Sequence, residues 1–392
     1  MDKVEELLTR GVANIIPGKN ELKTLLQGDT KLNVYLGIDP TATRIHLGHA
    51  VPLRKLQKFA ELGHNVTFLI GDFTALIGDT SDKETERPVL TPKEIEENFQ
   101  TYKKQAEKIL DFSKVKVRHN SQWLRKLSTE DFIKVAHRFS FGDFASRELV
   151  KKRLSESKHV GLHEAMYPAL QGYDSYFLDT DIQIGGTDQT FNMQAGRTLQ
   201  KELRKRESFV LATAFLMGTD GRKMSKTWGN AIWLTDEPSE MYAKIMRVED
   251  DLIIDYFTLG TDVALSEIEE IKKELKKGNP INTKKKLAKI IVSELYSKKN
   301  AEKAENDFER TVQNKEFPDD VMEFNVRKDT IVNEDLLVEI GLAGSKSEAK
   351  RLFAQGGVEI DGGRVTLKDV VEVVDNMVLR VGKRKFSKLK IS

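Results

Sequence analysis

Short apolar runs alternate with longer amphipathic runs along the first half of this chain, and this rhythm constrains the fold most strongly. KLNVYLGID and NVTFLIGD each have the length and composition of a buried strand. Between them, HLGHAVPLRKLQKFAELGH carries apolar residues at helical spacing. A strand, a helix and a second strand in this order form a unit of a parallel sheet. DIQIGGTDQTFNMQAGRTLQKELRK repeats the pattern, so the sequence predicts an α/β domain with a parallel sheet.

The chain is long enough for more than this one domain, because 392 residues exceed what a single core usually covers. We expect the sheet domain over residues 1–232, with a longer helical stretch over about 115–168 inserted within it. Charged runs with helical periodicity predict a small α-helical domain over 233–325. Residues 333–392 have the pattern of two helices followed by a hairpin that turns at DGG, which predicts a small α+β domain.

Composition excludes several classes of protein. The chain has no cysteine, which rules out disulfides, thiolate zinc sites and cysteine nucleophiles. The sequence contains no apolar stretch like a signal peptide or a membrane span, so we expect a soluble, cytoplasmic protein without a membrane partner. The formal net charge is only +2, so a nucleic-acid partner would need basic residues that are concentrated locally.

Two histidines, His46 and His49, follow the first predicted strand with Gly48 between them. If the strand ends near Asp39 and the helix begins near His49, both imidazoles project from the carboxyl edge of the sheet, where free backbone N–H groups favour anions. Gly48 would allow a flat ring to lie against the backbone. On this motif alone, two surface histidines beside a helix cap or half of a metal site are alternatives.

A second motif, GTDGRKMSKTWGN, covers residues 218–230. A turn-forming Gly-Asp-Gly precedes Lys223 and Lys226 on a polar segment without regular periodicity, which we expect to be a mobile loop. Two ammonium groups suit a polyphosphate. Taken alone, however, a pair of lysines in a loop is also typical of a solvated surface.

HLGH and KMSKT, taken together, resemble the HIGH and KMSKS signatures of class I aminoacyl-tRNA synthetases. Four segments narrow the resemblance to the tyrosyl-tRNA synthetases, over essentially the whole chain: YLGIDPTATRIHLGH, TALIGDTSDKETER, YPALQGYDS and QIGGTDQ. Thr227 stands where the general signature has serine and keeps the hydroxyl. The resemblance implies a Rossmann-like catalytic domain that forms tyrosyl-adenylate and pyrophosphate from L-tyrosine and ATP. Tyrosine would then pass to the terminal adenosine ribose of tRNA(Tyr).

The resemblance also implies a site for the amino acid. Tyr35 and Asp174 match the pair that hydrogen-bonds the substrate phenol, although a strand tyrosine is commonly core and an aspartate is commonly a helix cap. The other positions matched to tyrosine binding are Thr74, Asp79, Tyr167, Gln171 and Gln189, several of them around the α-ammonium group. The spacing of Tyr167, Gln171 and Asp174 supports this independently, because a helix would place all three on one face.

For the nucleotide, the matched ATP-binding positions are Gly37, Asp39, Gly48, Gly186, Asp188 and Lys226. QIGGTDQ alone would read as a plain turn that caps the next helix. The catalytic positions carried over from the family are Thr41, His46, His49, Lys83, Arg87, Lys223 and Lys226. Of these, His49 would shape the nucleotide pocket with Gly48, and Lys83 and Arg87 match a mobile basic loop. Mg²⁺ would accompany ATP and be held largely by phosphates and water, because no dedicated carboxylate cage is visible and we expect no protein-bound metal.

The remaining segments resemble parts that bind RNA or a second subunit. Residues 233–325 would bind the anticodon, and GLAGSKSEAKRLFAQGGVEIDGGRV resembles a small RNA-binding module of a ribosomal small-subunit protein and pseudouridine synthases. Its capped helix, predicted to begin at a Ser345/Glu348 capping box, carries Lys346, Lys350 and Arg351, which could follow a phosphate backbone. The family is homodimeric through the insertion, so SFGDFASRELVKKRL would contact a second copy.

Three rival functions compete with this interpretation. One is an adenylyltransferase of a related HxGH fold without an RNA partner, which the helical domain and the C-terminal RNA-binding module disfavour. Another is a tRNA-binding protein of synthetase ancestry that has lost catalysis, although each proposed catalytic position carries a suitable group. A third is tryptophanyl specificity, which the phenol-binding pair and the C-terminal module disfavour.

Overall fold

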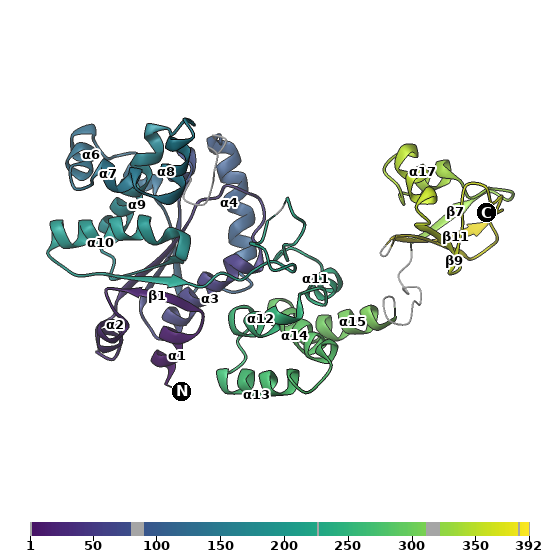
Figure 1. The fold of residues 1–392 in the computed structure, drawn as a ribbon, viewed down its shortest axis with the longest axis horizontal. Coiled ribbons are helices and arrows are strands. Elements are labelled where there is room, and N and C mark those ends of the chain that lie inside the picture. The colour runs from purple at the N-terminus through teal and green to yellow at the C-terminus, as the bar shows by residue number, and fades with distance from the viewer. Residues whose placement is uncertain (1, 80–89, 226, 311–321, 383–384, 392) are drawn as a thin grey trace. The chain divides into compact units, whose positions relative to one another are not determined.

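The computed structural model describes residues 2–79, 90–225, 227–310, 322–382 and 385–391 (Figure 1). Its contacts divide the chain into two compact units, residues 1–301 and 302–392. The first unit contains both the sheet and most of the helical segment that follows it, so the division into three domains stays a prediction. Within the described part of the chain, no helix combines the length and the apolar character needed to cross a membrane.

A six-stranded sheet forms the centre of the first unit, in the order β1-β6-β5-β2-β3-β4. Five strands run parallel, and β1 pairs antiparallel with β6 at one edge. The chain runs outward from β2 to β4 on one side and from β5 to β6 on the other, so the strand order reverses between β2 and β5. Ligands bind at such a reversal, beyond the carboxyl ends of the strands. The strands are β1 (Val12–Ile16), β2 (Asn33–Ile38), β3 (Asn65–Ile70), β4 (Val115–His119), β5 (Ile182–Gly186) and β6 (Phe209–Thr213).

Helices connect these strands as the periodicity predicts, and the α/β class with a parallel sheet is confirmed. The core between helix and sheet is built from fully buried apolar side chains such as Leu56, Phe59 and Phe68. The connecting helices are α3 (Leu47–Glu61), α4 (Pro92–Ala106), α9 (Leu162–Phe177) and α10 (Thr190–Arg204). Helices α9 and α10 pack against each other.

Three local expectations differ from the structure. The N-terminal run MDKVEELLTRGVANIIPGKNELKTLL is charged and helix-like as a sequence, which predicts a helix, yet between α1 (Lys3–Thr9) and α2 (Lys19–Leu26) it contains β1, whose apolar residues pair with β6. The helical stretch expected from residue 115 begins later, because Val115–His119 forms the edge strand β4. Helix α3 begins at Leu47 with His46 as its N-cap residue, two residues earlier than expected.

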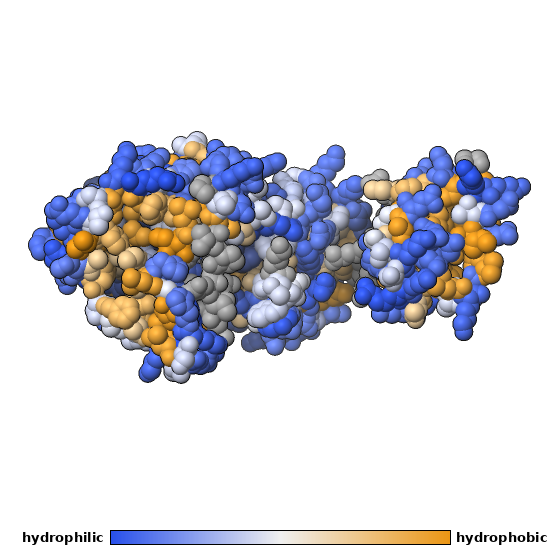
Figure 2. Space-filling model, turned by 90° about the horizontal axis from the view of Figure 1, so that it is seen from above, coloured by the Kyte–Doolittle hydropathy of each residue, from blue (hydrophilic) through white to orange (hydrophobic). Residues whose placement is uncertain are grey.

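Four short helices follow β4 within the predicted insertion: α5 (Ser121–Leu124), α6 (Thr129–Ala136), α7 (Phe141–Ala145) and α8 (Glu148–Ser155). Together with α9 they leave several large apolar side chains exposed, namely Ile133, Phe141, Leu154, Leu162, Met166 and Phe177. Figure 2 shows hydrophobic residues gathered on the face of the sheet domain that carries these helices. An exposed apolar area of this kind is typical of a protein–protein interface.

The helical segment begins after the sheet and includes α11 (Pro238–Ile245), α12 (Ile253–Gly260), α13 (Leu265–Leu275), α14 (Pro280–Leu295) and α15 (Lys298–Phe308). Polar side chains of the sheet domain contact this helical segment. The Arg10 guanidinium donates to backbone carbonyls at the end of α12, and Arg54 of α3 pairs with Asp262 and Glu294.

The second unit is a small α+β fold with the sheet order β7-β11-β10-β8-β9. Its elements are β7 (Met322–Val326), α16 (Glu334–Glu339), α17 (Lys346–Ala354), β8 (Val358–Ile360), β9 (Gly363–Arg364), β10 (Met377–Val381) and β11 (Lys385–Ile391). The expected hairpin turns at DGG, where Asp361 and Gly362 both have positive φ. The hydroxyl of Ser345 caps α17 by accepting from Glu348 N at 3.2 Å. The Glu348 carboxylate accepts from Gly344 N, one residue before the predicted partner.

Candidate active site

A cavity of about 670 Å³ opens where the strand order reverses, beyond the carboxyl ends of β2 and β5. This volume suits a small-molecule ligand. Lys83, Arg87 and Lys226 lie outside the described residues. The cavity brings together all the other predicted substrate and catalytic residues, which are Tyr35, Gly37, Asp39, Thr41, His46, Gly48, His49, Thr74, Asp79, Tyr167, Gln171, Asp174, Gly186, Asp188, Gln189 and Lys223.

Asp174 lines the cavity with only 3% of its surface exposed. Its Oδ1 accepts a hydrogen bond from Trp123 Nε1 at 2.7 Å, and its Oδ2 accepts from Asn120 Nδ2 at 3.0 Å. Burial raises the pKa of Asp174 to about 8, although these two hydrogen bonds act to lower it. A polar group placed here therefore meets a carboxyl whose position is fixed by two donors.

Tyr35, on β2, lies beside Asp174 and is also buried. Its hydroxyl donates to Gln183 Oε1 at 3.2 Å, and Gln183 Nε2 donates to the carbonyl of Met193 at 2.9 Å. Gly196 makes room for this amide, because a Cβ there would lie 2.5 Å from Gln183 Oε1. Burial, with Asp174 nearby, raises the pKa of Tyr35, so its hydroxyl keeps the proton.

A polar network lies between β2 and α9. Tyr167 donates from its hydroxyl to Asp39 Oδ2 at 2.9 Å, and Thr74 donates to Asp39 Oδ1 at 2.8 Å. Asp79 accepts from Gln189 Nε2 at 2.8 Å. Burial, with Asp39 beside it, raises the pKa of Tyr167, which therefore remains a hydrogen-bond donor. The carboxylates and hydroxyls together form a surface that attracts a cation such as an ammonium group.

The two histidines line the same cavity from the start of α3, where His46 is the N-cap residue and His49 lies in the first turn. Their rings are 3.9 Å apart, and the backbone N–H of His46 donates to His49 Nδ1 at 3.4 Å. Gly48 is needed because a Cβ there would lie 2.9 Å from Nδ1 of His46. Burial, with repulsion from His49 and Lys223, lowers the pKa of His46 to about 2, so this imidazole is neutral. Nδ1 of His46 has no hydrogen-bond partner among the described residues.

The segment after KMSKT is bonded to the HLGH turn. His46 and Trp233 form an antiparallel bridge, and Leu47 N donates to the carbonyl of Ile232 at 2.9 Å. The Trp233 ring meets the His46 ring edge to face at 5.7 Å. Lys223 Nζ lies 3.5 Å from the Asp188 carboxylate, so these two predicted residues meet across the cavity.

Sequence reasoning misses four residues that support these positions: Asn120, Trp123, Gln183 and Trp233. Asn120 directly follows a strand, as Asp39 does, and this placement is a signal that could have identified it. Gln183 begins the matched segment QIGGTDQ, and its place there is also a signal that could have identified it. Trp123 and Trp233 have no comparable signal, because each contacts a site residue that is distant in sequence.

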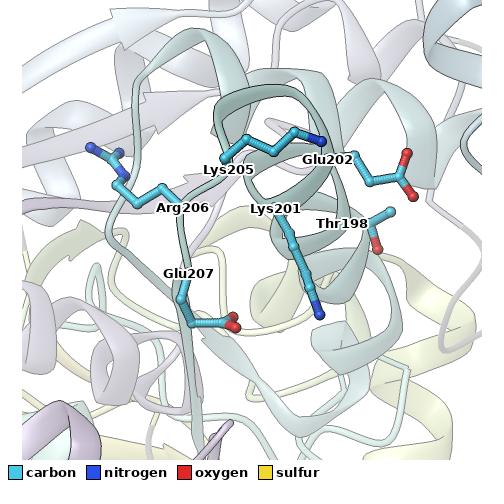
Figure 3. Close-up of a pocket in the computed structure, with 6 residues that line it drawn as sticks. All are labelled: Thr198, Lys201, Glu202, Lys205, Arg206 and Glu207. Carbon is cyan, nitrogen blue, oxygen red and sulfur yellow. The ribbon is translucent and has the colours of Figure 1, made fainter.

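A second hollow lies at the end of α10 (Figure 3) and is lined by Thr198, Lys201, Glu202, Lys205, Arg206 and Glu207. Its charged groups pair with neighbours, since Arg206 lies 2.8 Å from Asp179 and Glu202 lies 3.2 Å from Arg138. Of the described residues that line it, none is a predicted site residue. We therefore take the cavity at the strand reversal as the candidate active site.

Comparison with known proteins agrees with this geometry. The sequence family described as tRNA synthetases class I (W and Y) matches residues 27–313. The chain is 43% identical over 390 residues to the tyrosine–tRNA ligase of Thermotoga maritima, covering 98% of this chain and 96% of that protein. It is 42% identical over 386 residues to tyrosine–tRNA ligase 2 of Vibrio cholerae, covering 98% of this chain and 97% of that protein.

Solved structures share the fold. Tyrosyl-tRNA synthetase from Archaeoglobus fulgidus, complexed with L-tyrosine, aligns with a TM-score of 0.62 at 26% identity, covering 78% of this chain and 100% of that chain. A truncated mitochondrial tyrosyl-tRNA synthetase of Aspergillus nidulans aligns with a TM-score of 0.66, covering 78% and 92%, and at 23% identity it supports the fold alone. The resemblance seen in the sequence is confirmed, and the chain belongs to the tyrosine–tRNA ligases, within the class I tRNA synthetases for tryptophan and tyrosine.

Proposed function

We propose that this chain is a tyrosine–tRNA ligase that activates L-tyrosine with ATP and transfers it to the terminal adenosine ribose of tRNA(Tyr). The observation that carries the proposal is that one cavity is lined both by the buried Tyr35 and Asp174 and by the HLGH histidines with Lys223. The first pair suits a phenol, and the second group suits a phosphate chain. Tyrosine and ATP bound together in this cavity would bring their reacting groups together.

The chemistry needs alignment more than it needs a base. The tyrosine carboxylate is already ionised, so its oxygen attacks the α-phosphorus directly, forming one P–O bond while the bond to pyrophosphate breaks. Catalysis then consists of aligning the two groups and stabilising charge on the departing pyrophosphate. We assign these tasks to Thr41, His46 and Lys223, together with the basic residues Lys83, Arg87 and Lys226. His49 and Gly48 shape the nucleotide end, and the contacts assigned to the nucleotide are Gly37, Asp39, Gly186 and Asp188.

Recognition of tyrosine is assigned to two groups of residues. Tyr35 and Asp174 would hydrogen-bond the phenol. A substrate without the hydroxyl, such as phenylalanine, would leave them unpaired at a cost of several kcal/mol, and discrimination of about 10⁵ against phenylalanine is already known for this enzyme family. The α-ammonium group would be held by Asp79, Tyr167 and Gln171, with Thr74 and Gln189 beside them. Support comes from α9, which carries Tyr167, Gln171 and Asp174 on the face that lines the cavity.

Mg²⁺ would enter as the ATP complex. Within the described part of the chain, no group of three His, Asp or Glu side chains has the arrangement of a metal site. The cavity carboxylates of Asp39 and Asp79 accept hydrogen bonds from protein groups, so phosphate and water oxygens would supply most ligands to the ion. Bound there, Mg²⁺ would neutralise part of the phosphate charge.

The second unit would bind tRNA, and residues 233–325 would bind its anticodon. Lys346 pairs with Asp335 and Lys350 pairs with Glu334, but these exposed ion pairs are weak and could exchange for phosphates. Arg351 lies on the same exposed helix. Deletion from Asn333 should therefore abolish tRNA charging and spare adenylate formation, and normal charging by the truncated chain would contradict this role.

The active form would be a homodimer in the cytoplasm. The apolar area on α6 to α9 supports a dimer, because an exposed area of this kind is stabilised when a second copy covers it (Figure 2). The compartment follows from the reaction, since tRNA charging serves translation, and from a sequence without cysteine.

Pyrophosphate exchange into ATP tests the proposal, with tyrosine, phenylalanine and tryptophan supplied separately. We expect exchange with tyrosine alone. Exchange with tryptophan would indicate the related specificity, and an absence of exchange with all three would indicate a tRNA-binding protein without catalysis.

A further inference from the structure

The turn between β2 and α3 carries Thr41 and ends at His46, and several of its backbone groups find their partners outside the turn. Within it, Thr41 N donates to the carbonyl of Asp39 at 2.8 Å. The carbonyls of Pro40 and Thr43 and the N–H of Ile45 are bonded instead by side chains of α4. The conformation of this turn therefore depends on a helix that contributes few groups to the cavity itself.

Three polar side chains of α4 reach the turn, and their spacing places them on one helical face. Asn98 Nδ2 donates to the carbonyl of Pro40 at 2.9 Å, and Thr101 Oγ1 donates to that of Thr43 at 2.9 Å. One helical turn further on, Gln105 reaches the same segment. Asn98 and Gln105 are 7% and 4% exposed, so these contacts are largely protected from water.

Gln105 makes the most specific contact of the three, because its amide binds in both directions. Nε2 donates to the carbonyl of Thr43 at 2.9 Å, while Oε1 accepts from the N–H of Ile45 at 2.7 Å. Reversing the amide would place Nε2 against the N–H of Ile45 and Oε1 against the carbonyl of Thr43, so that neither hydrogen bond could form. The backbone of the turn therefore fixes the orientation of the amide. Ile45 is fully buried, and its N–H would have to find another partner if the amide were removed.

We propose that Gln105 is a positioning residue for adenylate formation, because it fixes the backbone between Thr41 and His46 and so sets where these two side chains meet the nucleotide. Gln105 is absent from the described lining of the cavity, so it acts only through the turn. The inference rests on the proposed function. Small displacements of aligned groups cost far more in rate than in ground-state binding, so kcat should respond more than tyrosine affinity.

Gln105→Met tests this, since methionine keeps the length of the side chain and removes the amide. We expect kcat for pyrophosphate exchange with tyrosine to fall about tenfold, below the roughly hundredfold that a displacement of about 1 Å can cost, with the tyrosine dissociation constant unchanged within about twofold. Gln100→Met is the matched control. It lies on the same helix, is exposed and bonds only to Glu96 among the contacts described, so kcat should be unchanged.

A double-mutant cycle separates positioning from stability. In a chain that already carries His46→Ala, adding Gln105→Met should lower kcat by a further factor of less than about three, because one of the groups that Gln105 positions is already gone. If Gln105→Met fails to fold, Gln105→Glu keeps the acceptor for Ile45 and should lose between about threefold and tenfold in kcat.

The inference is overturned if kcat stays within about twofold while the unfolding temperature falls, or if kcat and tyrosine affinity fall equally. Absence of tyrosine exchange by the unmodified chain would overturn the proposed function, and this inference with it. Normal exchange by the unmodified chain with an unchanged kcat in the variant overturns the inference alone.

Discussion

The Tyr167 hydroxyl donates a hydrogen bond to Asp39 Oδ2 over 2.9 Å, joining the middle of α9 to the residue that follows β2. Tyr167 is proposed to hold the amino acid, and Asp39 is proposed to contact the nucleotide. The two substrate sites therefore share a hydrogen bond, and Thr74 completes the arrangement by donating to the other oxygen of Asp39. A ligand that engages one of these groups should affect the other.

Tyr167→Phe removes the donor to Asp39 and keeps the ring. A hydrogen bond to a charged group contributes about 1.5–3 kcal/mol, so kcat/KM for tyrosine in pyrophosphate exchange should fall roughly ten- to 150-fold. Tyr173→Phe, on the same helix but outside the described cavity lining, is the control and should change kcat/KM less than about twofold. Equal losses in the two variants would show that α9 is merely destabilised.

His46→Ala should lower adenylate formation by about 3 kcal/mol, roughly a hundredfold, with little change in tyrosine affinity. Because burial lowers the pKa of His46 to about 2, the imidazole stays neutral at every pH at which the enzyme is assayed. The fold loss should therefore be the same from about pH 6 to about pH 9. The exposed His163→Ala is the control, and stopped-flow adenylate formation is the measurement. A loss that disappears as pH rises through the normal histidine range would identify the imidazolium as the active form.

The sequence predicts the fold correctly in segments where apolar residues recur periodically over many positions. It predicts the site where the site residues lie close together in the sequence. The run behind HLGH spans a helix of fifteen residues, and Tyr167, Gln171 and Asp174 share a helical face. β1 escapes prediction because a strand of five residues between two short helices has too little pattern to separate it from them.

Contacts across the fold escape prediction for a different reason. Trp123 reaches Asp174 over 51 positions of sequence, and Gln183 reaches Tyr35 over 148. No local period encodes such pairs, since they arise only when the parallel strands bring distant segments to one edge. The family resemblance supplies the residues matched to substrates but not the residues that hold them in place.

The proposed dimer can be tested on the apolar area of the insertion. Phe141 and Leu162 are 65% and 67% exposed, and a charge at either would be costly to bury in an interface. Sedimentation of the unmodified chain at micromolar concentration should give twice the chain mass of 44.5 kDa, and Phe141→Glu with Leu162→Glu should give the chain mass itself. Val370→Glu, at an exposed apolar position of the second unit, should leave the dimer intact. A monomeric unmodified chain would refute the dimer.

Lys55 should make stability depend on pH. It lies on α3, is 6% exposed and donates to the carbonyl of Leu7, and burial with Arg10 nearby lowers its pKa to about 7. The unfolded chain keeps this proton up to about pH 10.5, whereas the folded chain releases it above about pH 7. Between these values the unfolded state binds more protons, so the free energy of unfolding rises with pH, by at most about 1.4 kcal/mol per unit.

Lys55→Met removes this dependence. The gain in unfolding free energy between about pH 7.5 and about pH 9.5 should be smaller in the variant by about 2–3 kcal/mol, measured by urea denaturation at both values. Lys58→Met, one turn away and partly exposed, should keep the slope of the unmodified chain. An unchanged slope in Lys55→Met would mean that the buried amine stays protonated.

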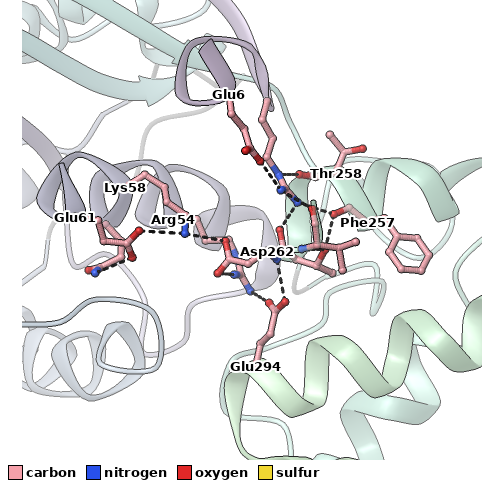
Figure 4. Close-up of polar contacts among 12 residues, drawn as sticks. Glu6, Arg54, Lys58, Glu61, Phe257, Thr258, Asp262 and Glu294 are labelled. Carbon is pink, nitrogen blue, oxygen red and sulfur yellow. Dashed lines mark hydrogen bonds and ion pairs between the residues drawn. The ribbon is translucent and has the colours of Figure 1, made fainter. Parts of the chain in front are cut away.

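Arg10 should hold the helical segment against the sheet. Its guanidinium donates to the backbone carbonyls of four residues at the end of α12 and just after it, which are Phe257, Thr258, Thr261 and Val263, and its side chain is only 13% exposed. Figure 4 labels two of these residues, Phe257 and Thr258, near the pairs that Arg54 forms with Asp262 and Glu294. The planar group satisfies carbonyls that the end of a helix leaves without partners. Lysine has one compact ammonium group in place of this fork and cannot reach all four.

Arg10→Lys should therefore lower the free energy of unfolding by about 1–3 kcal/mol, because buried carbonyls lose their donors. Hydrogen exchange should show the change locally, as lost protection along α12 before any loss in the sheet. Arg138→Lys is the matched control, since Arg138 is exposed and pairs only at the surface with Glu202, and its effect should stay within about 0.5 kcal/mol. Equal losses of unfolding free energy in Arg10→Lys and Arg138→Lys would mean that the positive charge of Arg10 matters and its planar guanidinium does not. A uniform loss of hydrogen-exchange protection would mean that the sheet and the helical segment unfold as one unit.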